Sequence, residues 1–454
     1  MAADQHLPPR GGDHPLPPRG GDHPLPPRGG EARDTLFRDI RLVDPDSGLD
    51  APGSLLVRDG RIAAIGAITE PPEDAIVVHG EGGVLCPGLV DMRAALGEPG
   101  FEYRETIKSA ARAAAAGGIT TLAALPDSQP AIDDPALVRL LRARGEETGS
   151  LTILPYGAVT RGCRGEEMAE LGLLREAGAV AFTDGTRAIG NARLMRLTLS
   201  YARGFGAMVV QHPEEPSLAG GAATEGELAT RLGLPSIPAA AEAILVARDI
   251  RLAELTGGAV HFAHVSTAEA LELIRRAKRA GLRVTCDTAP PYFDLNETAI
   301  GFYRTYAKLS PPLRPEADRQ AVVAALADGT IDAIASDHQP RDADDKRLPF
   351  AQAAPGGAGL ATLLGVTLAQ VHNGSLDMVR ALHLLTAGPA RLLGIAAGRL
   401  AVGAPADLCL FHPERVWQVV AGKLPGKAQN TPFDGRAMEG RVLGTWKAGR
   451  RVFG

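Results

Sequence analysis

The sequence predicts an α/β protein, a (β/α)8 TIM-like barrel with a small β-sandwich built from both chain ends. Eight apolar, strand-like runs occur between residues 84 and 338, and each precedes an amphipathic or alanine-rich helical stretch. Strands of a parallel barrel are buried on both faces and therefore form such continuous apolar runs. Shorter strand-like runs flank this region on both sides. We expect the sandwich over residues 34–85 and 395–454, and the barrel over residues 86–394.

The first 33 residues are predicted to be a disordered tail. They contain the nonapeptide DHPLPPRGG at 13–21 and again at 22–30. Pro-Pro units favour extended conformations, Gly-Gly interrupts them, and little apolar surface is available to build a core. A proline-rich docking arm is the alternative interpretation of this segment.

The predicted sandwich uses short strands separated by turn residues. The N-terminal pieces are TLFRDIRLVD, GSLLVRDGRIAAIG and AIVVHG, and the C-terminal pieces are GRLAVGAPADLCLFHP and GRVLGTWKAGRRVFG. The predicted barrel strands are VLCPGLVDM (84–92), ITTLAALP (119–126), LTILPYGAV (151–159), AVAFTD (179–184), GAMVVQH (206–212), AVHFAHV (259–265), RVTCDTA (283–289) and DAIASDH (332–338). An open, doubly wound sheet is the alternative, but no GxGxxG follows the first strand.

Composition excludes several classes of protein. The 454 residues are 45% hydrophobic and 22% charged, with a net charge of −5. The charges are mixed in sign, so we expect no nucleic-acid partner. No apolar segment approaches the roughly 20 residues that span a bilayer, so we expect no membrane partner. The four cysteines are widely spaced, which fits a reducing, cytoplasmic location.

Polar side chains occur where the predicted strands end. In a parallel barrel these ends meet at one mouth, where imidazoles and carboxylates could bind zinc. The alternative is that each is a turn, capping or hydrogen-bonded core residue. The residues at these positions are Asp91, Arg93, Asp184, His212, His264, Asp337 and His338.

Several ordered motifs resemble those of the dihydroorotase family of the amidohydrolase superfamily. They are PGLVDMRAALGEPG at 87–100, AVAFTDG, QHPEEP, HFAHVST, AKLSPPLR and IASDH, and the resemblance covers residues 35–454. It implies that Asp184 matches the carboxylate that bridges two metal ions. His212 and His264 match ligands of the more exposed metal. Asp337 matches the carboxylate that binds the other metal and acts as general base.

The departures from the family pattern are concentrated in the site. Arg93 and Ala95 stand at the positions of the first two histidine ligands. Gly97 replaces the arginine that would hold the substrate carboxylate, Asp127 replaces an asparagine with the same task, and Arg341 replaces a histidine near the substrate.

The charge of Arg93 lowers the number of metal ions that we expect the site to bind. A guanidinium stays charged and cannot be a ligand, so it would repel a divalent cation and attract Asp337 and Asp184. At about 4 Å and an effective dielectric near 20, each pair of unit charges interacts by roughly 4 kcal/mol. We therefore expect Arg93 to occupy the inner metal position and to pair with Asp337. Asp184, His212 and His264 are still enough for one zinc ion, so the expectation is one zinc at most, or none.

The sequence thus predicts a dihydroorotase-like protein of pyrimidine (UMP) biosynthesis with lost or weakened catalysis. The resemblance implies a non-catalytic scaffold for aspartate carbamoyltransferase, within a homo- or hetero-oligomer. The alternative is an active cyclic amidohydrolase, such as a zinc dihydroorotase acting on carbamoyl-aspartate and dihydroorotate with a single metal. A purely structural oligomer is the third possibility.

Overall fold

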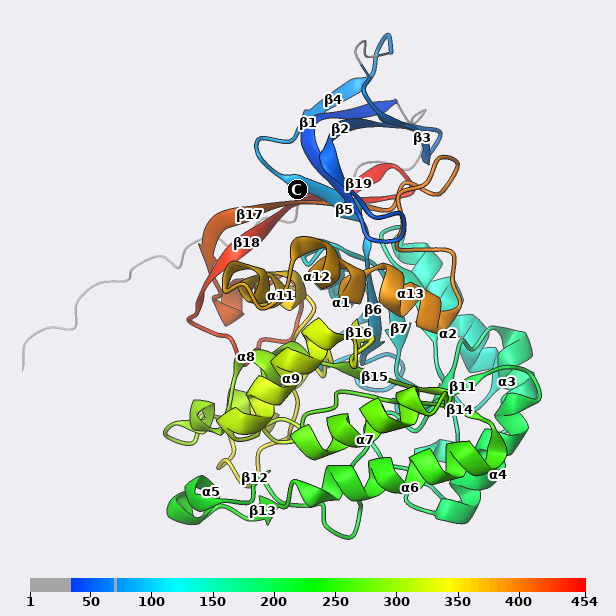
Figure 1. The fold of residues 1–454 in the computed structure, drawn as a ribbon, viewed down its shortest axis with the longest axis vertical. Helices are drawn as coiled ribbons and strands as arrows, with labels where there is room; N and C mark the ends of the chain where they lie inside the picture. Colours follow the sequence, from blue (N-terminus) through cyan, green and yellow to red (C-terminus); the bar gives the residue numbers. More distant parts are fainter. Residues whose placement is uncertain (1–33, 69–71) are drawn as a thin grey trace, which may run out of the picture. The chain divides into compact units, whose positions relative to one another are not determined.

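Parallel strands close into the predicted barrel in the computed structural model, which describes residues 34–68 and 72–454 (Figure 1). The tail predicted at 1–33 lies outside the described residues. The barrel strands are β6 (Leu89–Ala94), β7 (Ile119–Ala124), β8 (Thr152–Pro155) continued by β9 (Gly157–Ala158), β10 (Phe182–Thr183), β11 (Met208–Gln211), β14 (Ala259–Phe262), β15 (Val284–Thr288) and β16 (Ala333–Ile334).

The barrel closes between its first strand and the segment after its last. Ala94 of β6 forms a parallel bridge with His338, and the backbone N–H of Ala95 donates to the carbonyl of His338 at 2.8 Å. An open, doubly wound sheet would leave these edges apart. The barrel prediction is therefore confirmed and its alternative is excluded.

Helices surround the barrel, and their starts follow local capping rules. In α7 (Ala268–Arg279), the Thr267 side chain accepts from the backbone N–H of Ala270, and buried Leu271 and Ile274 recur at helical spacing. The other helices of the barrel are α1 (Ile107–Ala116), α2 (Pro135–Thr148), α3 (Leu171–Ala177), α4 (Ala192–Arg203), α6 (Ala240–Thr256), α9 (Glu316–Asp328), α11 (Leu363–His372), α12 (Met378–Leu385) and α13 (Ala387–Leu393). Shorter elements in its loops are α5 (Glu227–Leu232), α8 (Pro290–Asp294), α10 (Ala343–Arg347), β12 (Ala223–Thr224), β13 (Ser236–Ile237) and 3-10 turns at Arg161–Cys163, Glu297–Ile300 and Thr305–Ala307.

Both chain ends supply the second β unit, as predicted. Its order is β19-β18-β17-β5-β1-β2-β3, with β4 beside β1. The ring centroids of Phe37 and Trp446 lie 4.8 Å apart in its core and link the two ends. The strands are β1 (Thr35–Asp44), β2 (Leu49–Arg58), β3 (Arg61–Gly66), β4 (Ile76–His79), β5 (Val84–Pro87), β17 (Leu408–Gln418), β18 (Ala437–Lys447) and β19 (Arg450–Phe453), with a 3-10 turn at Ala421–Lys423.

The run predicted as one strand at 84–92 is two strands. β5 belongs to the outer sheet and β6 to the barrel, and Gly88 separates them. A side chain on Gly88 would overlap Thr120 of the neighbouring strand β7, so the crossing point requires glycine. As a result Asp91 and Arg93 lie inside β6, not after it.

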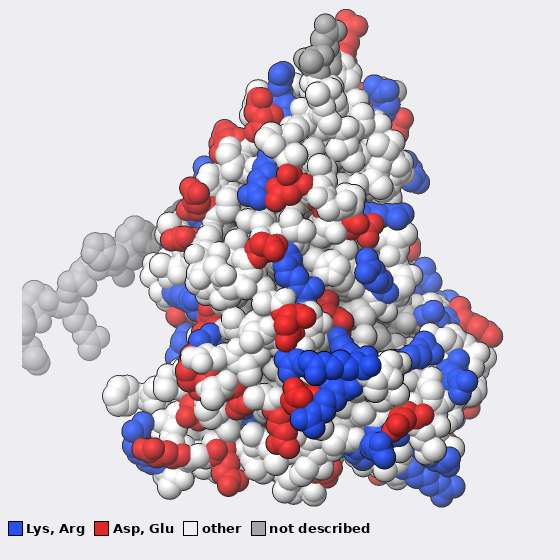
Figure 2. Space-filling view, in the orientation of Figure 1, with Lys and Arg blue, Asp and Glu red and all other residues white. Residues whose placement is uncertain are grey.

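The surface carries charges of both signs. On the face in Figure 2, Lys and Arg side chains are interspersed with Asp and Glu, and the densest basic group lies over α7. Two of the basic side chains of α7 are paired, because Lys278 binds Asp332 at 2.6 Å and Arg275 binds Asp328 at 2.9 Å. Within 34–68 and 72–454, no helix combines the length and apolarity needed to cross a bilayer.

Candidate functional site

Arg93 lies at the centre of the barrel mouth. Its side chain, only 1% exposed, extends from β6, and its Nε donates to Oδ1 of Asp337 at 2.7 Å. Its Nη2 donates to the backbone carbonyl of Gly185 at 3.0 Å. The predicted pair between Arg93 and Asp337 is therefore present, and it connects the first barrel strand to the segments that follow β10 and β16.

The surroundings keep Arg93 charged. Burial opposes the charged form, but the carboxylates of Asp337, Asp287 and Asp127 outweigh it and raise the pKa of the guanidinium. Its Nη1 is buried and has no hydrogen-bond partner among the described residues. The mouth of the barrel thus holds a permanent, incompletely satisfied positive charge.

The two predicted histidine ligands bind each other. His212 follows β11 and His264 follows β14, and Nδ1 of His212 shares a 2.9 Å hydrogen bond with Nε2 of His264. Burial and then the charge of Arg93 lower the pKa of His212 to about 3, and the same two causes lower the pKa of His264 well below its usual range. Both rings are therefore neutral near pH 7, and each has one ring nitrogen engaged in the hydrogen bond to the other.

Asp184 is held by Thr160 and not by Arg93. Its Oδ1 accepts from the backbone N–H of Thr160 at 2.9 Å, and its Oδ2 from the hydroxyl at 2.5 Å. Burial raises the pKa of Asp184 to about 6 despite these bonds. We expected Arg93 to attract this carboxylate, whereas its guanidinium contacts the carbonyl of the next residue, Gly185.

Sequence reasoning missed Asp287, which supports His264 from β15. Its Oδ1 accepts the backbone N–H of His264 at 2.5 Å, and its Oδ2 bonds Nε2 of His261 at 2.9 Å. Asp287 lies in the predicted strand RVTCDTA, so its position near a strand end was the available signal. His264 (φ 41°) and Asp337 (φ 46°) both adopt the left-handed backbone conformation, a strain that often marks functional sites.

A cavity of about 590 Å³ lies beside this cluster and contains the altered substrate positions. Asp127 accepts from the N–H and hydroxyl of Thr186 at 3.1 and 2.6 Å. Gly97 has φ 75°, and a Cβ there would overlap the backbone oxygen of Glu105. An arginine at this position would therefore require the loop to move. Ala95 and Arg341 also line the cavity, and Nε of Arg341 donates to the carbonyl of Pro355 at 2.8 Å.

The residues present do not fit a metal ion. In the part of the chain that the structure describes, no three His, Cys, Asp or Glu side chains come together as possible ligands. Asp184, His212 and His264 engage Thr160 and each other, and the Arg93 guanidinium binds the carboxylate of Asp337. The structure thus brings Arg93 together with Asp337, and His212 with His264, but it does not assemble the three-ligand zinc site that we expected as an option.

Comparison with known proteins places these features in a family. Residues 82–270 match a family model described as dihydro-orotase-like. A curated relative from Pelobacter propionicus named dihydroorotase is 46% identical over 419 residues, which cover 92% of this chain and 99% of the relative. A second curated relative named dihydroorotase, from Citrifermentans bemidjiense, is 43% identical over an alignment that covers 91% of this chain and 98% of the relative.

Solved structures show the same fold. The L-hydantoinase (dihydropyrimidinase) from Arthrobacter aurescens superposes with a TM-score of 0.83 at 26% identity, covering 92% of this chain and 96% of that one. The dihydropyrimidinase from Brevibacillus agri gives a TM-score of 0.78 at 22% identity, over 92% of this chain and 95% of its own.

Proposed function

This chain belongs to the dihydroorotase family of amidohydrolases, and from that premise we propose that it is a dihydroorotase-type protein of pyrimidine biosynthesis that lacks metal-dependent catalysis. We further propose that it acts as a scaffold for aspartate carbamoyltransferase. The observation that carries the first proposal is the pair between Arg93 and Asp337.

The pair opposes two requirements of the hydrolytic reaction, the metal ion and the general base. A divalent cation at this point would face a buried guanidinium, and their repulsion at about 4 Å is on the order of 8 kcal/mol at an effective dielectric near 20. Asp337, the expected general base, accepts from Arg93 and also from Nε2 of Gln339 at 3.1 Å. Both bonds fall on Oδ1, so this oxygen is engaged and is poorly placed to take a proton from water.

Substrate recognition is altered as well. A substrate carboxylate would meet Gly97 and Asp127 where the family motif has an arginine and an asparagine, so it would lose a bidentate partner and meet a like charge. These changes lower the expected affinity for dihydroorotate independently of the metal.

A second candidate is an active dihydroorotase. The relatives favour it, because those with 42–46% identity over nearly the whole chain bear that name. It requires that a metal displace the Arg93 side chain from Asp337.

Metal content and activity separate the two candidates. The full chain, expressed and purified with added zinc, should contain far less than one zinc per chain by mass spectrometry of the element and should not cyclise carbamoyl-aspartate. Two zinc ions per chain with turnover would overturn the first candidate. Retention of aspartate carbamoyltransferase by the tagged chain, compared with an unrelated tagged barrel, tests the scaffold role.

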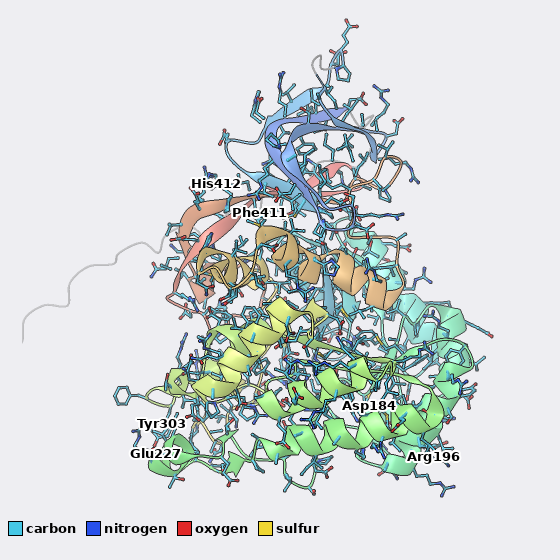
Figure 3. The ribbon with its side chains drawn as sticks, viewed as in Figure 1. Asp184, Arg196, Glu227, Tyr303, Phe411 and His412 are labelled. Atoms are coloured by element: carbon cyan, nitrogen blue, oxygen red, sulfur yellow. The ribbon has the colours of Figure 1, made fainter. Side chains whose placement is uncertain are left out.

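A reconstructed site gives a sharper control. The double variant Arg93→His with Ala95→His restores two imidazoles at the mouth and removes the guanidinium, so it should take up zinc. Arg196→His on the outer surface of α4 (Figure 3) adds an imidazole elsewhere and should not. Equal zinc content in all three proteins would contradict the role given to Arg93.

A further inference from the structure

We propose that the cavity at the barrel mouth binds a small molecule carrying a phosphate or diphosphate group. The ligand would be held by arginines that line the cavity at positions other than 97. This inference goes beyond the proposed function and does not depend on it. The four arginines that line the cavity are Arg104, Arg164, Arg187 and Arg341.

Two of these arginines have guanidinium donors to spare. Arg164 is exposed and forms no hydrogen bond or ion pair with the described residues. Arg187 is exposed too, and the one hydrogen bond that its side chain forms with a described residue is a long contact of 3.5 Å with the carbonyl of Cys163. Both side chains can therefore turn to an anion in the cavity without breaking strong bonds.

The other two are half-buried and preorganised. The guanidinium of Arg104 lies 4.8 Å from the ring centroid of Phe101, ion-pairs with Asp345 at 3.3 Å, and has a buried Nε without a described partner. Nε of Arg341 is fixed on Pro355, whereas its terminal nitrogens donate to no described residue. Burial and the nearby charge of Arg104 lower the pKa of Arg341. A bound anion would relieve this repulsion.

Most carboxylates at the cavity are already engaged. Glu98, Asp127 and Asp133 line it together with the four arginines, and Asp345 pairs with Arg104 from outside the lining. Asp127 already accepts from Thr186, and Asp133 accepts from the backbone N–H of Gly162 at 2.8 Å. The free groups of the cavity are therefore mainly donors.

The chemistry of these donors indicates the ligand class. Guanidinium groups bind phosphate oxygens through paired, charge-assisted hydrogen bonds. A cavity of about 590 Å³ is in the size range of small-molecule sites. Several arginines around one such space match a group with two or more negative charges better than a single carboxylate.

Calorimetric titration of the full chain with sodium pyrophosphate, in EDTA and low salt, tests the proposal. We expect one site per chain and weaker binding of inorganic phosphate. The double variant Arg164→Gln with Arg187→Gln should weaken pyrophosphate binding about tenfold or more, since each lost bond involves charged groups. Arg196→Gln, on the outer surface of α4, should change it less than twofold. Both variants alter exposed side chains, and equal melting temperatures will show that they fold.

Three outcomes would overturn the proposal: undetectable pyrophosphate binding, binding unaffected by the double variant, or an equal loss in Arg196→Gln. None of them bears on zinc content, so failure here is distinguishable from failure of the proposed function.

Discussion

Two buried arginine–carboxylate pairs of this barrel have different surroundings. Arg314 and Glu242, 2% and 1% exposed, approach to 3.5 Å beside the start of α7. Glu242 also accepts from the backbone and hydroxyl of both Ser266 and Thr267. Arg314 donates to Ser266 at 3.0 Å and to Thr224 at 3.2 Å.

The pair at the mouth has fewer neutral partners. Asp337 is 11% exposed and has Gln339 besides Arg93, while Nη1 of Arg93 and Nδ1 of His264 lack partners in the described residues. The comparison shows how a structural charge pair differs from one at a former reaction site. Each arginine leaves one buried terminal nitrogen without a described hydrogen-bond partner, Nη2 in Arg314 and Nη1 in Arg93. The carboxylates differ: both oxygens of Glu242 accept from hydroxyl or backbone N–H groups, whereas the two described bonds to Asp337 both fall on Oδ1.

The largest effect is expected where the pair is most enclosed. Glu242→Ala leaves Arg314 buried without its countercharge and should lower the free energy of unfolding by about 3–5 kcal/mol in urea titrations. Glu254→Ala, on the same helix in an exposed pair with Arg251, should cost under about 1 kcal/mol. Similar costs for both would mean that enclosure does not govern the first pair.

The buried histidine pair at the mouth should make the free energy of unfolding fall at acidic pH. His212 titrates near 3 when folded and near 6.5 when unfolded, so the unfolded chain binds more protons between these values and stability falls as pH drops from 6.5. His212→Gln should therefore lose less stability than the wild type between pH 6.5 and 4, by up to about 3 kcal/mol. Parallel pH profiles would refute this assignment.

Removing the charge of Arg93 at the mouth should lower the free energy of unfolding less than removing Glu242 from the enclosed pair does. Arg93→Met keeps most of the side-chain volume and should reduce stability by about 2 kcal/mol at pH 7, because Asp337 is partly exposed and can take up a proton. Burial already raises the folded-state pKa of Asp337, and loss of Arg93 raises it further, so the penalty should grow as the pH is increased from 5 to 8. The measurement is urea unfolding across this range, and a penalty that shrinks with pH would contradict it.

The smallest effect is expected at Thr160. Thr160→Val removes the hydroxyl that donates to Asp184 but keeps the backbone bond, and should cost about 1 kcal/mol. Thermal unfolding of this variant beside the wild type provides the measurement. A loss as large as that in Glu242→Ala would indicate that Asp184 depends on this hydroxyl as strongly as the enclosed pair depends on its partners.

Much of the fold could be predicted because buried parallel strands leave continuous apolar runs. The division of 84–92 at Gly88 could not, since it depends on the approach of Thr120 and on pairing with β17 at the other end of the chain. The pair of Arg93 with Asp337 could be predicted from charge together with the positions that the family resemblance gave to these two residues. The contacts of Asp184 with Thr160 depend on where distant loops meet, which spacing does not reveal.

The strand before Gly88, β5, pairs with a strand from the other end of the chain, which has a consequence during synthesis of the protein. Cys86 of β5 lies opposite Cys409 of β17 in the antiparallel ladder, so the outer sheet cannot be completed until the ribosome has released the chain beyond residue 409. At roughly 5–20 residues per second, the edge of β5 waits unpaired for on the order of tens of seconds, while the barrel strands emerge next to it. Nascent chains of this protein therefore carry an open strand edge while the residues between β5 and β17 are synthesised.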